Sequence, residues 1–511
     1  MKHIGIIGAG ISGLATAKAF LQQGYRVTVI EKGPAIGGVW EKSRSYLGVA
    51  TQTTRDEYAY SDFPMPASYP LWPSGAQVQA YLTDYARHFQ VLPHIRFNTE
   101  VTYLGYQPAT WYMEVIDLKY NKPYKLYFDF VAICTGTFHS PYVPSYPGMD
   151  SFSRAGKTIM HSSQVQHESQ LQGKSVAVVG FAKSATDIAT LAADVSTKCT
   201  LLYRKAQWKV PRYFGNKLNM RYLLFSRFSE AFFNAPHKTL FQKILHTAGK
   251  PMVWAQWRGL EALLKSQFKL KACDMVPTHR IEDQISCSLG VAPEGFYDKV
   301  QRGTIDARRT EIDHFDREKV VLKNGETITP DVLVFGTGFR QDLPFLESSY
   351  RKLIIDQQGS FRLFRNIIHP LVPQLGFVGY NSSLFTTLTS EIAAEWLVSY
   401  VQGQLLLPGN EAIEKDMHYM ASWRTNSRPI ASEFGGTCIA PFNFMHLDQL
   451  MRDMGLRTKA SRNPVYEFFK PINPKDYAKL LSAKRKTNVV RPVAVNTSVK
   501  SRASIQKTVI D

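Results

Sequence analysis

Closely spaced cysteines are missing from this chain of 511 residues. Its cysteines stand far apart and include no C-x-x-C pair: Cys134, Cys199, Cys273, Cys287 and Cys438. Structural zinc sites and redox dithiols need cysteines a few residues apart, so we expect neither a metal site nor a redox dithiol. Unpaired cysteines suit a reducing compartment, and the sequence therefore favours a cytoplasmic protein.

Long apolar runs are missing as well. A membrane-spanning helix needs roughly 20 consecutive apolar residues, and the best candidate segment, 222–228, is interrupted by Arg227. The first predicted strand begins only a few residues after Met1, which leaves no room for a secretory leader. We therefore expect no transmembrane segment.

Acidic residues are few beside basic ones: 42 Asp and Glu stand against 61 Lys and Arg, for a formal net charge of +19. Part of the excess lies in segment 461–511, which we interpret as a basic, solvated C-terminal tail. No recognised nucleic-acid motif accompanies the charge, so we expect no nucleic-acid partner, whereas a peripheral contact with a membrane surface stays open. Steering of an anionic nucleotide is sufficient to explain the remaining charge. The sequence does not indicate an oligomeric state.

The strongest signal is a strand, a glycine-rich turn and a helix at the N-terminus. The apolar residues 4–7 lead into the turn at 8–13, and a second strand over 26–30 ends in an acid. The first glycine permits a tight turn, the second lets the backbone approach a pyrophosphate, and the third lets helix and strand pack closely. The helix N-terminus offers N–H groups to phosphate, and the acid is placed to accept hydrogen bonds from ribose hydroxyls. The residues predicted to bind a dinucleotide here are Gly8, Gly10, Ser12, Gly13, Glu31 and Lys32.

A second strand–turn–helix unit follows in the middle of the chain. Residues 175–179 form an apolar strand, 180–189 repeat the turn and helix, and the next strand ends at Arg204-Lys205 instead of an acid. An acid favours an unmodified ribose, whereas arginine and lysine favour a 2′-phosphate, so we assign FAD to the first site and NADPH to the second. The alternative is that Arg204 is only a solvated strand end. The residues predicted to bind NADPH are Gly180, Ala182, Lys183, Ser184, Ala185, Arg204 and Lys205.

Further segments are expected beside the flavin. Residues 37–40 form a second flexible turn, and a predicted strand over 95–101 follows. Two distant runs, 129–136 and 331–338, both read Asp, an apolar stretch and Thr-Gly. Such runs are typical of buried parallel strands, and the glycine lets the chain leave the sheet close to a cofactor. We interpret them as a repeated domain crossover rather than a coincidental pair of core strands. These segments add Gly38, Val39, Trp40, Val101, Thr135, Gly136 and Gly338 to the predicted cofactor-binding residues.

The order of these units predicts an α/β fold with two Rossmann-like, dinucleotide-binding domains, the NADPH domain inserted into the FAD domain. The FAD domain is expected to comprise 1–170 and 329–460, with the chain returning to it at Asp331. The NADPH domain is expected to comprise 171–328, and 461–511 forms the tail.

Smaller patterns fill in the domains. Segments 111–118 and 125–128 predict strands of a β-meander, and Asn324-Gly325 predicts a hairpin turn. Aromatic residues crowd segment 206–300, within which we expect a helical insertion at about 211–295. The insertion could line a substrate entrance or touch a membrane surface. An inserted helical pair with its own small core is the simpler interpretation.

Together, the motifs resemble those of the flavin-containing monooxygenases, within the wider class B flavin monooxygenases. The resemblance covers roughly residues 1–396, and the order of its motifs is more specific than any one of them. The second glycine turn is similar to that of plant-type members. Segment 152–161 departs from the family's F-x-G-x-x-x-H signature by extra residues, and Val165 stands where the family has an aromatic. The matching segments are 8–13, 37–40, 60–64, 161–163, 180–189 and 335–339.

The resemblance implies an NADPH- and O2-dependent monooxygenase that acts on a small molecule. In such enzymes NADPH reduces FAD, the reduced flavin takes up O2 as a C4a-hydroperoxide, and a soft nucleophile, nitrogen or sulfur, takes the distal oxygen. The protein binds, orients and excludes water, so no metal or protein nucleophile is expected. The family's active-site amide falls at Gln52, the candidate catalytic residue. Three alternatives stay open: an NADPH oxidase or reductase that never oxygenates a substrate, Baeyer–Villiger oxygenation of a ketone, and a non-catalytic cofactor-binding scaffold.

Overall fold

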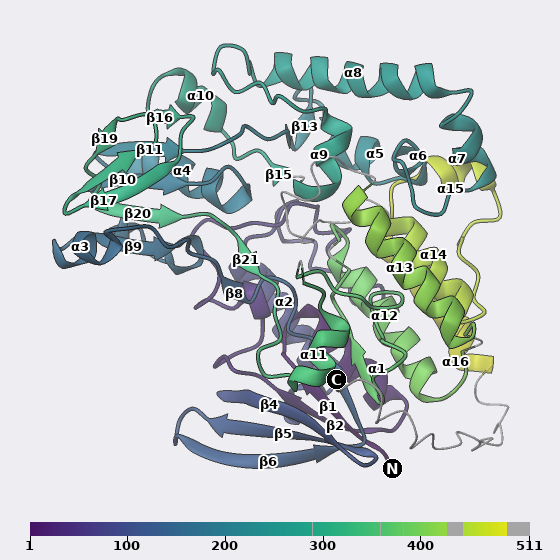
Figure 1. Cartoon of the computed structure of the whole chain (residues 1–511). Helices are drawn as coiled ribbons and strands as arrows, with labels where there is room; N and C mark the ends of the chain where they lie inside the picture. Colours follow the sequence, from purple (N-terminus) through teal and green to yellow (C-terminus); the bar gives the residue numbers. More distant parts are fainter. Residues whose placement is uncertain (289, 358, 382, 406, 427–442, 488–511) are drawn as a thin grey trace, which may run out of the picture.

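Two parallel β-sheets form separate lobes, and helices from the middle and end of the chain lie beside them (Figure 1). The structure is a computed structural model, and it describes all residues except 289, 358, 382, 406, 427–442 and 488–511. None of the helices in this described part combines the length and the apolar character of a transmembrane span.

The first sheet has the N-terminal strand at its centre. Its strands run parallel in the order β22-β7-β1-β2-β3. The central strands are buried, as expected for a parallel sheet covered on both faces. α1 (Ile11–Gln22) packs against the sheet and against α12 (Thr386–Val401). The strands are β1 (His3–Ile7), β2 (Arg26–Ile30), β3 (Ile95–Arg96), β7 (Phe130–Ile133) and β22 (Leu375–Phe377).

The second sheet is built around the second glycine turn. Its strands are also parallel, in the order β16-β11-β10-β20-β9. α4 (Lys183–Val195) begins directly after the turn and packs on β10 and β11. Each lobe therefore repeats the same strand–turn–helix start. The strands are β9 (Thr158–His161), β10 (Ser175–Val179), β11 (Lys198–Leu202), β16 (Ile305–Arg308) and β20 (Val332–Phe335).

Two of these strands lie outside the predicted NADPH domain, 171–328. β9 precedes it and β20 follows it, yet β20 pairs with β10 on one side and with β9 on the other. The prediction that the chain returns to the FAD domain at Asp331 is therefore wrong. The two Asp–apolar–Thr-Gly runs describe a buried strand equally well, so the local pattern cannot tell which sheet each strand joins. One run supplies β7 to the first sheet and the other supplies β20 to the second.

The chain crosses between the lobes soon after each Thr-Gly. β8 (Ser140–Pro141) follows β7, β21 (Phe339–Arg340) follows β20, and these two short strands pair antiparallel. The backbone N–H of Tyr142 also donates to the carbonyl of Gly338 at 2.9 Å. Both runs thus lead into a crossing, as the sequence predicts.

Each lobe carries a three-stranded antiparallel meander. The meander of the first lobe is the predicted one. In the second lobe the Asn324-Gly325 turn joins β18 to β19, so it closes the second hairpin of that meander and not the first. The strands are β4 (Thr99–Gln107), β5 (Thr110–Asp117), β6 (Lys122–Phe128), β17 (Ile312–Asp316), β18 (Lys319–Leu322) and β19 (Thr327–Ile328).

Helices make up most of the insertion between β11 and β16, and there are more of them than the predicted pair. Trp257, Leu264 and Phe232 are buried, and they belong to the same apolar cluster as the helices of the first lobe. The insertion therefore shares the main core and has no separate one. Its elements are β12 (Lys209–Val210), β13 (Tyr213–Phe214), β14 (Leu218–Asn219), α5 (Met220–Leu224), α6 (Arg227–Ala231), α7 (Leu240–Leu245), α8 (Lys250–Gln267), α9 (Ile281–Ser288), β15 (Gly290–Val291) and α10 (Phe296–Gln301).

The first part of the predicted tail is folded. Ile472 and Tyr477 are buried, and the backbone N–H of Ile472 donates to the carbonyl of Phe225 at 2.7 Å. The prediction of a solvated end is therefore wrong for 461–482, because apolar side chains between the basic ones pack on the insertion; 488–511 lie outside the described residues. The remaining helices are α2 (Gly75–His88), α3 (Met149–Arg154), α11 (Ser348–Ile354), α13 (Asn410–Asn426), α14 (Asn443–Asp453), α15 (Pro464–Phe469) and α16 (Pro474–Thr487).

Candidate active site and cofactor sites

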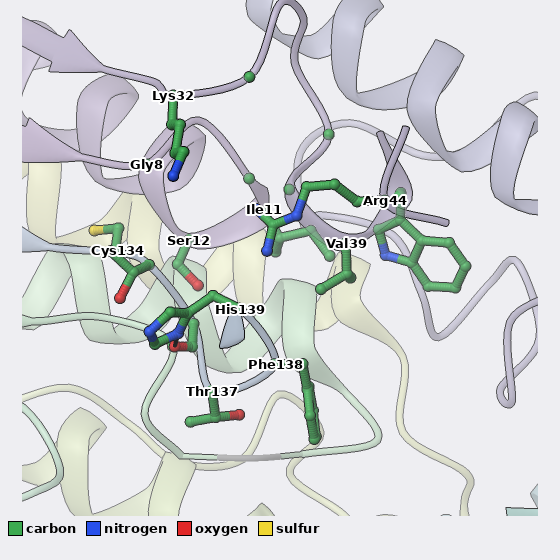
Figure 2. A pocket seen from close by; sticks show the side chains of 18 of the residues that line it. Gly8, Ile11, Ser12, Lys32, Val39, Arg44, Cys134, Thr137, Phe138 and His139 are labelled. Carbon is green, nitrogen blue, oxygen red and sulfur yellow. Dashed lines mark hydrogen bonds between the residues drawn. The ribbon is translucent and has the colours of Figure 1, made fainter. Parts of the chain in front are cut away.

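A cavity of about 1260 Å³ opens at the carboxyl ends of the first sheet's strands, where ligands of open α/β sheets bind. Figure 2 shows part of its lining, with Lys32 and Arg44 above and Thr137 and Phe138 below in that view. The structure brings many of the predicted residues together along this cavity: Gly8, Gly10, Ser12, Glu31, Lys32, Gly38, Val39, Trp40, Gln52, Val101, Thr135, Gly136 and Lys183.

Two glycine turns meet at one wall of the cavity. A Cβ added to Gly10 would lie 3.3 Å from the Cα of Gly38, and one added to Gly38 would lie 3.1 Å from the Cα of Gly10. Gly38 also has a φ of +59°, which favours glycine. Gly13 lies behind this wall, where a Cβ would come within 1.8 Å of the carbonyl oxygen of Gly8. Gly10 and Gly38 thus let the two turns approach each other closely, and Gly13 lets α1 pack on β1.

Glu31 is buried and already bound to backbone. Its Oε2 accepts a hydrogen bond from the N–H of Ala9 and its Oε1 from the N–H of Gly33, both at 2.7 Å. The carboxylate therefore fixes the glycine turn, and each oxygen keeps a further lone pair for a donor in the cavity. Its contact with ribose stays a prediction. Lys32, beside it, forms an exposed ion pair with Glu100 at 2.6 Å.

The cavity has features that a bound dinucleotide would complete. α1 begins at Gly10 with no side-chain cap, so the first N–H groups of the helix are available to phosphate oxygens. The Nδ2 amino group of Asn381 is buried, lines the cavity and has no hydrogen-bond partner in the described residues. A buried donor without an acceptor is costly, and a polar ligand edge would satisfy it. The glycine wall, the open helix end and this donor together fit a dinucleotide.

The second glycine turn is packed tightly, and it lies outside the lining of the large cavity. Gly180 has a φ of +125°, and a Cβ there would lie 2.5 Å from the carbonyl oxygen of Gly336. Residue 336 must also be a glycine, because a Cβ added to Gly336 would lie 2.5 Å from the Cβ of Ala185. The side chain of Ala185 thus packs against Gly336, the residue that directly follows β20. The predicted residues that do not line the cavity are Gly13, Gly180, Ala182, Ser184, Ala185, Arg204, Lys205 and Gly338.

Arg204 and Lys205 are exposed in the bend after β11, at the carboxyl edge of the second sheet. Arg309 follows the neighbouring strand β16, and its Nε donates to the carbonyl of Arg204 at 3.5 Å. Three basic side chains therefore gather at the edge where the sequence predicts a 2′-phosphate. The assignment of that phosphate to Arg204 and Lys205 stays a prediction.

Lys183 connects the second glycine turn to the cavity of the first lobe. It lines that cavity and forms an ion pair with Asp187 one helical turn later. Asp187 also accepts a hydrogen bond from the hydroxyl of Tyr46 at 2.7 Å, and Tyr46 belongs to the first lobe. The predicted FAD and NADPH sites therefore share a wall.

Gln52 lies where the first lobe meets the insertion. It lines the cavity, and its Oε1 accepts a hydrogen bond from the backbone N–H of Val291 at 3.1 Å. Val291 belongs to β15, which pairs with β12. With Oε1 held, Nε2 is the end of the amide that remains to donate to another group. The predicted role of Gln52 beside the flavin stays a prediction.

Several cavity residues lie outside the predicted site. His139 contacts two carbonyl oxygens, that of Gly136 through Nδ1 and that of Asp342 through Nε2, each at 3.0 Å. Burial lowers the pKa of His139. The ring thus ties the two crossing segments together beside the cavity. Its place three residues after Gly136 is the signal that could have indicated it; Asn381, which follows β22, had only a short apolar run before it.

Lys209 is a buried lysine close to the second glycine turn. Its Nζ lies 5.3 Å from the centroid of the Phe181 ring, and no ion pair with a described acid is formed. Burial, with a smaller contribution from the charge of Lys183, lowers the pKa of Lys209 to about 7. Lys209 is not among the residues predicted from the sequence.

Known proteins resemble this chain along most of its length. Residues 1–434 match the family described as flavin-binding monooxygenase-like. A probable flavin-containing monooxygenase 1 of Arabidopsis thaliana is 28% identical over an alignment of 520 positions, which covers 93% of this chain and 96% of that protein. The S-allyl-L-cysteine S-oxygenase of Allium sativum superposes with a TM-score of 0.61 at 18% identity, over 96% of this chain and 94% of the other.

A steroid monooxygenase bound to NADP superposes with a TM-score of 0.64 at 18% identity, over 88% of this chain and 96% of the other. The sequence-based expectations of family, fold class and cofactors are therefore confirmed. The chain belongs to the flavin-binding monooxygenase-like family, and it is an FAD- and NADPH-dependent monooxygenase with two Rossmann-like domains.

Proposed function

We propose that this enzyme transfers one oxygen atom from O2 to a soft nucleophile, a nitrogen or a sulfur, of a small organic molecule. The observation that carries the proposal is the wall shared by the two predicted nucleotide sites, where Lys183, the first residue of α4 after the second glycine turn, lines the cavity of the first lobe. Hydride transfer between two nucleotides requires their reactive ends to meet. The side chains that line the cavity then determine which substrate can bind beside the two nucleotides.

The cavity offers binding and orientation and little reactive chemistry of its own. Its cysteine, Cys134, is buried, and burial raises the pKa of its thiol to about 12. It is therefore a neutral thiol at pH 7 and a weak nucleophile. Among the described residues, no group of three His, Cys, Asp or Glu side chains could hold a metal ion. Reduced FAD, when bound, supplies the chemistry that activates O2.

The chain's own residues act by position. The glycine turn around Gly10 and the buried donor of Asn381 would hold FAD, and Gln52 would present its Nε2 to the cofactors from a fixed amide. His139 closes the wall through its contacts with the carbonyl oxygens of Gly136 and Asp342, and burial lowers its pKa. A nitrogen or sulfur acceptor attacks with its own lone pair, so it needs no general base from the protein. This requirement suits the described lining, in which His139 contacts two backbone carbonyls and Cys134 contacts Thr16.

The proposal is tested by giving the purified holoenzyme NADPH, 18O2 and three acceptors in turn: a thioether, a tertiary amine and a cyclic ketone. We expect the thioether or the amine to gain one labelled oxygen and to raise the ratio of product to NADPH consumed. A ratio near one for the ketone alone would replace the proposal by Baeyer–Villiger oxygenation. NADPH consumption that ends entirely in hydrogen peroxide with every acceptor would identify an oxidase.

A further inference from the structure

A group of exposed apolar side chains lies on the helical insertion and on the folded part of the tail. They come from α7, from the first turns of α8 and from α15, and each is between 50% and 75% exposed. Single exposed apolar residues are ordinary, whereas a cluster of large ones marks an interaction surface. We call this cluster the apolar patch; it consists of Leu240, Phe241, Ile244, Met252, Trp254, Val465, Tyr466 and Phe469.

The three segments meet although two of them are far apart in the sequence. The rings of Phe241 on α7 and Phe468 on α15 lie edge to face, with centroids 5.4 Å apart. The backbone N–H of Gly249 donates to the carbonyl of Ile244 at 3.1 Å, so α8 starts directly at the end of α7. Figure 1 shows α7 and α15 together at one margin of the molecule, with α8 leading away from them. The apolar patch therefore occupies one corner of the protein.

The segments that carry the apolar patch contain almost no acid. Segment 231–260 contains no Asp or Glu, and Glu467 is the only acid in segment 454–475. Glu467 is buried and forms an ion pair with Lys470 at 2.8 Å. Exposed cations stand among the apolar residues: Lys243 on α7, Lys250 at the start of α8 and Arg462 just before α15. The corner thus presents apolar side chains and positive charge, without an exposed carboxylate in either segment.

We propose that the apolar patch docks the enzyme on a membrane surface that contains anionic lipids. Large aromatic and aliphatic side chains enter the boundary between headgroups and acyl chains, and lysine and arginine beside them attract anionic headgroups. The charge argues against a second copy of this chain as the occupant, because a symmetric contact would bring two positive surfaces together. A lipid surface satisfies both properties of the corner at once, and it requires no spanning helix.

The test uses the full-length holoenzyme and vesicles of phosphatidylcholine, either pure or with about one third phosphatidylserine, in a flotation assay. We expect the protein to float with the anionic vesicles. The double variant Leu240→Asp, Ile244→Asp should bind them at least about tenfold more weakly, because each change replaces an inserting side chain by a charge. Lys243→Glu with Lys250→Glu should weaken binding to anionic vesicles and leave binding to pure phosphatidylcholine unchanged.

The matched control is Tyr120→Asp, which places the same charge on a side chain that is 79% exposed in the β5–β6 turn of the first lobe. It should bind vesicles as the unmodified enzyme does. Flavin absorbance and NADPH oxidation in buffer show that each variant is folded. Absence of binding to either vesicle, binding that survives the double variant, or an equal loss in Tyr120→Asp would overturn the proposal. Self-association in sedimentation velocity without lipid, abolished by the double variant, would replace it by a protein interface.

Discussion

Gln52 and Val291 are joined by a hydrogen bond across 239 positions of the sequence, from the backbone N–H of Val291 to the Oε1 of Gln52 at 3.1 Å. The amide that the family resemblance places beside the flavin is therefore oriented by a strand of the insertion. Gln52 can therefore do two things with different atoms: Oε1 anchors the side chain to Val291, and Nε2 can donate to the cofactors. Mutation can separate the two.

Replacing Gln52 by Leu should separate NADPH oxidation from oxygenation. Loss of a buried hydrogen bond costs about 1–3 kcal/mol, so we expect the fraction of NADPH that yields product to fall by roughly one to two orders of magnitude. NADPH should still be oxidised at a comparable rate, with hydrogen peroxide released instead. The measurement is peroxide formed per NADPH consumed. Gln52→Glu is the control for anchoring, since it keeps an oxygen for Val291 and loses the donor; coupling restored in that variant would show that only the anchor matters.

Gly10→Val should yield protein without flavin. A Cβ at this position would already lie 3.3 Å from the Cα of Gly38, and the two methyl groups of valine would occupy the space in front of the turn. We expect the purified variant to be colourless, with the ratio of 450 nm to 280 nm absorbance as the measurement. Gly259→Ala on α8 is the control, because no atom lies within 4 Å of its added Cβ. A yellow, fully loaded Gly10→Val protein would refute the assignment of the first site.

Arg204→Ala should reduce the preference for NADPH over NADH. Charge-assisted contacts to phosphate contribute roughly 1.5–3 kcal/mol, so the ratio of the two kcat/KM values should fall by at least about tenfold. Arg302→Ala, at an exposed position after α10, provides a control for the loss of one positive charge. If the unmodified enzyme used both nucleotides equally, the proposed 2′-phosphate contact would be untenable.

Lys209 should make the free energy of unfolding increase as the pH rises from neutral to alkaline values. Burial lowers its pKa to about 7, while the unfolded chain has an ordinary value of about 10.4. Between these values the unfolded state binds more protons, so stability rises with pH, by up to about 4 kcal/mol; the gain is lost as pH falls toward 7.

The measurement for Lys209 is urea denaturation of the holoenzyme from pH 7 to 10. Lys209→Met should be more stable than the unmodified protein at pH 7, and this advantage should shrink as the pH rises. Lys217→Met, at an exposed position, should leave the pH dependence unchanged. A constant difference between Lys209→Met and the unmodified protein across this range would show that Lys209 does not titrate there.

Local pattern was sufficient for the two nucleotide turns, because glycines at 8, 10 and 13 and the buried runs around them report a conformation that only a few sequences permit. It was insufficient for β20, since residues 332–335 look the same whether they join the first sheet or the second. That choice is made by long-range pairing. His139 and Asn381 were missed for a related reason: both reach the cavity from the ends of short segments that no motif marks. The helices α15 and α16 were not predicted, because the basic residues around them favoured a solvated tail.

The paired crossing strands β8 and β21 have a mechanical consequence. Two chain segments that lie side by side and share hydrogen bonds form a ribbon, and its strands cannot slide past one another without losing those bonds. Sliding one crossing segment past the other would break the pairing of Phe339 with Pro141 and the hydrogen bond from Tyr142 to Gly338. Bending preserves both. We therefore expect the two lobes to open and close by bending this ribbon rather than by sliding along it.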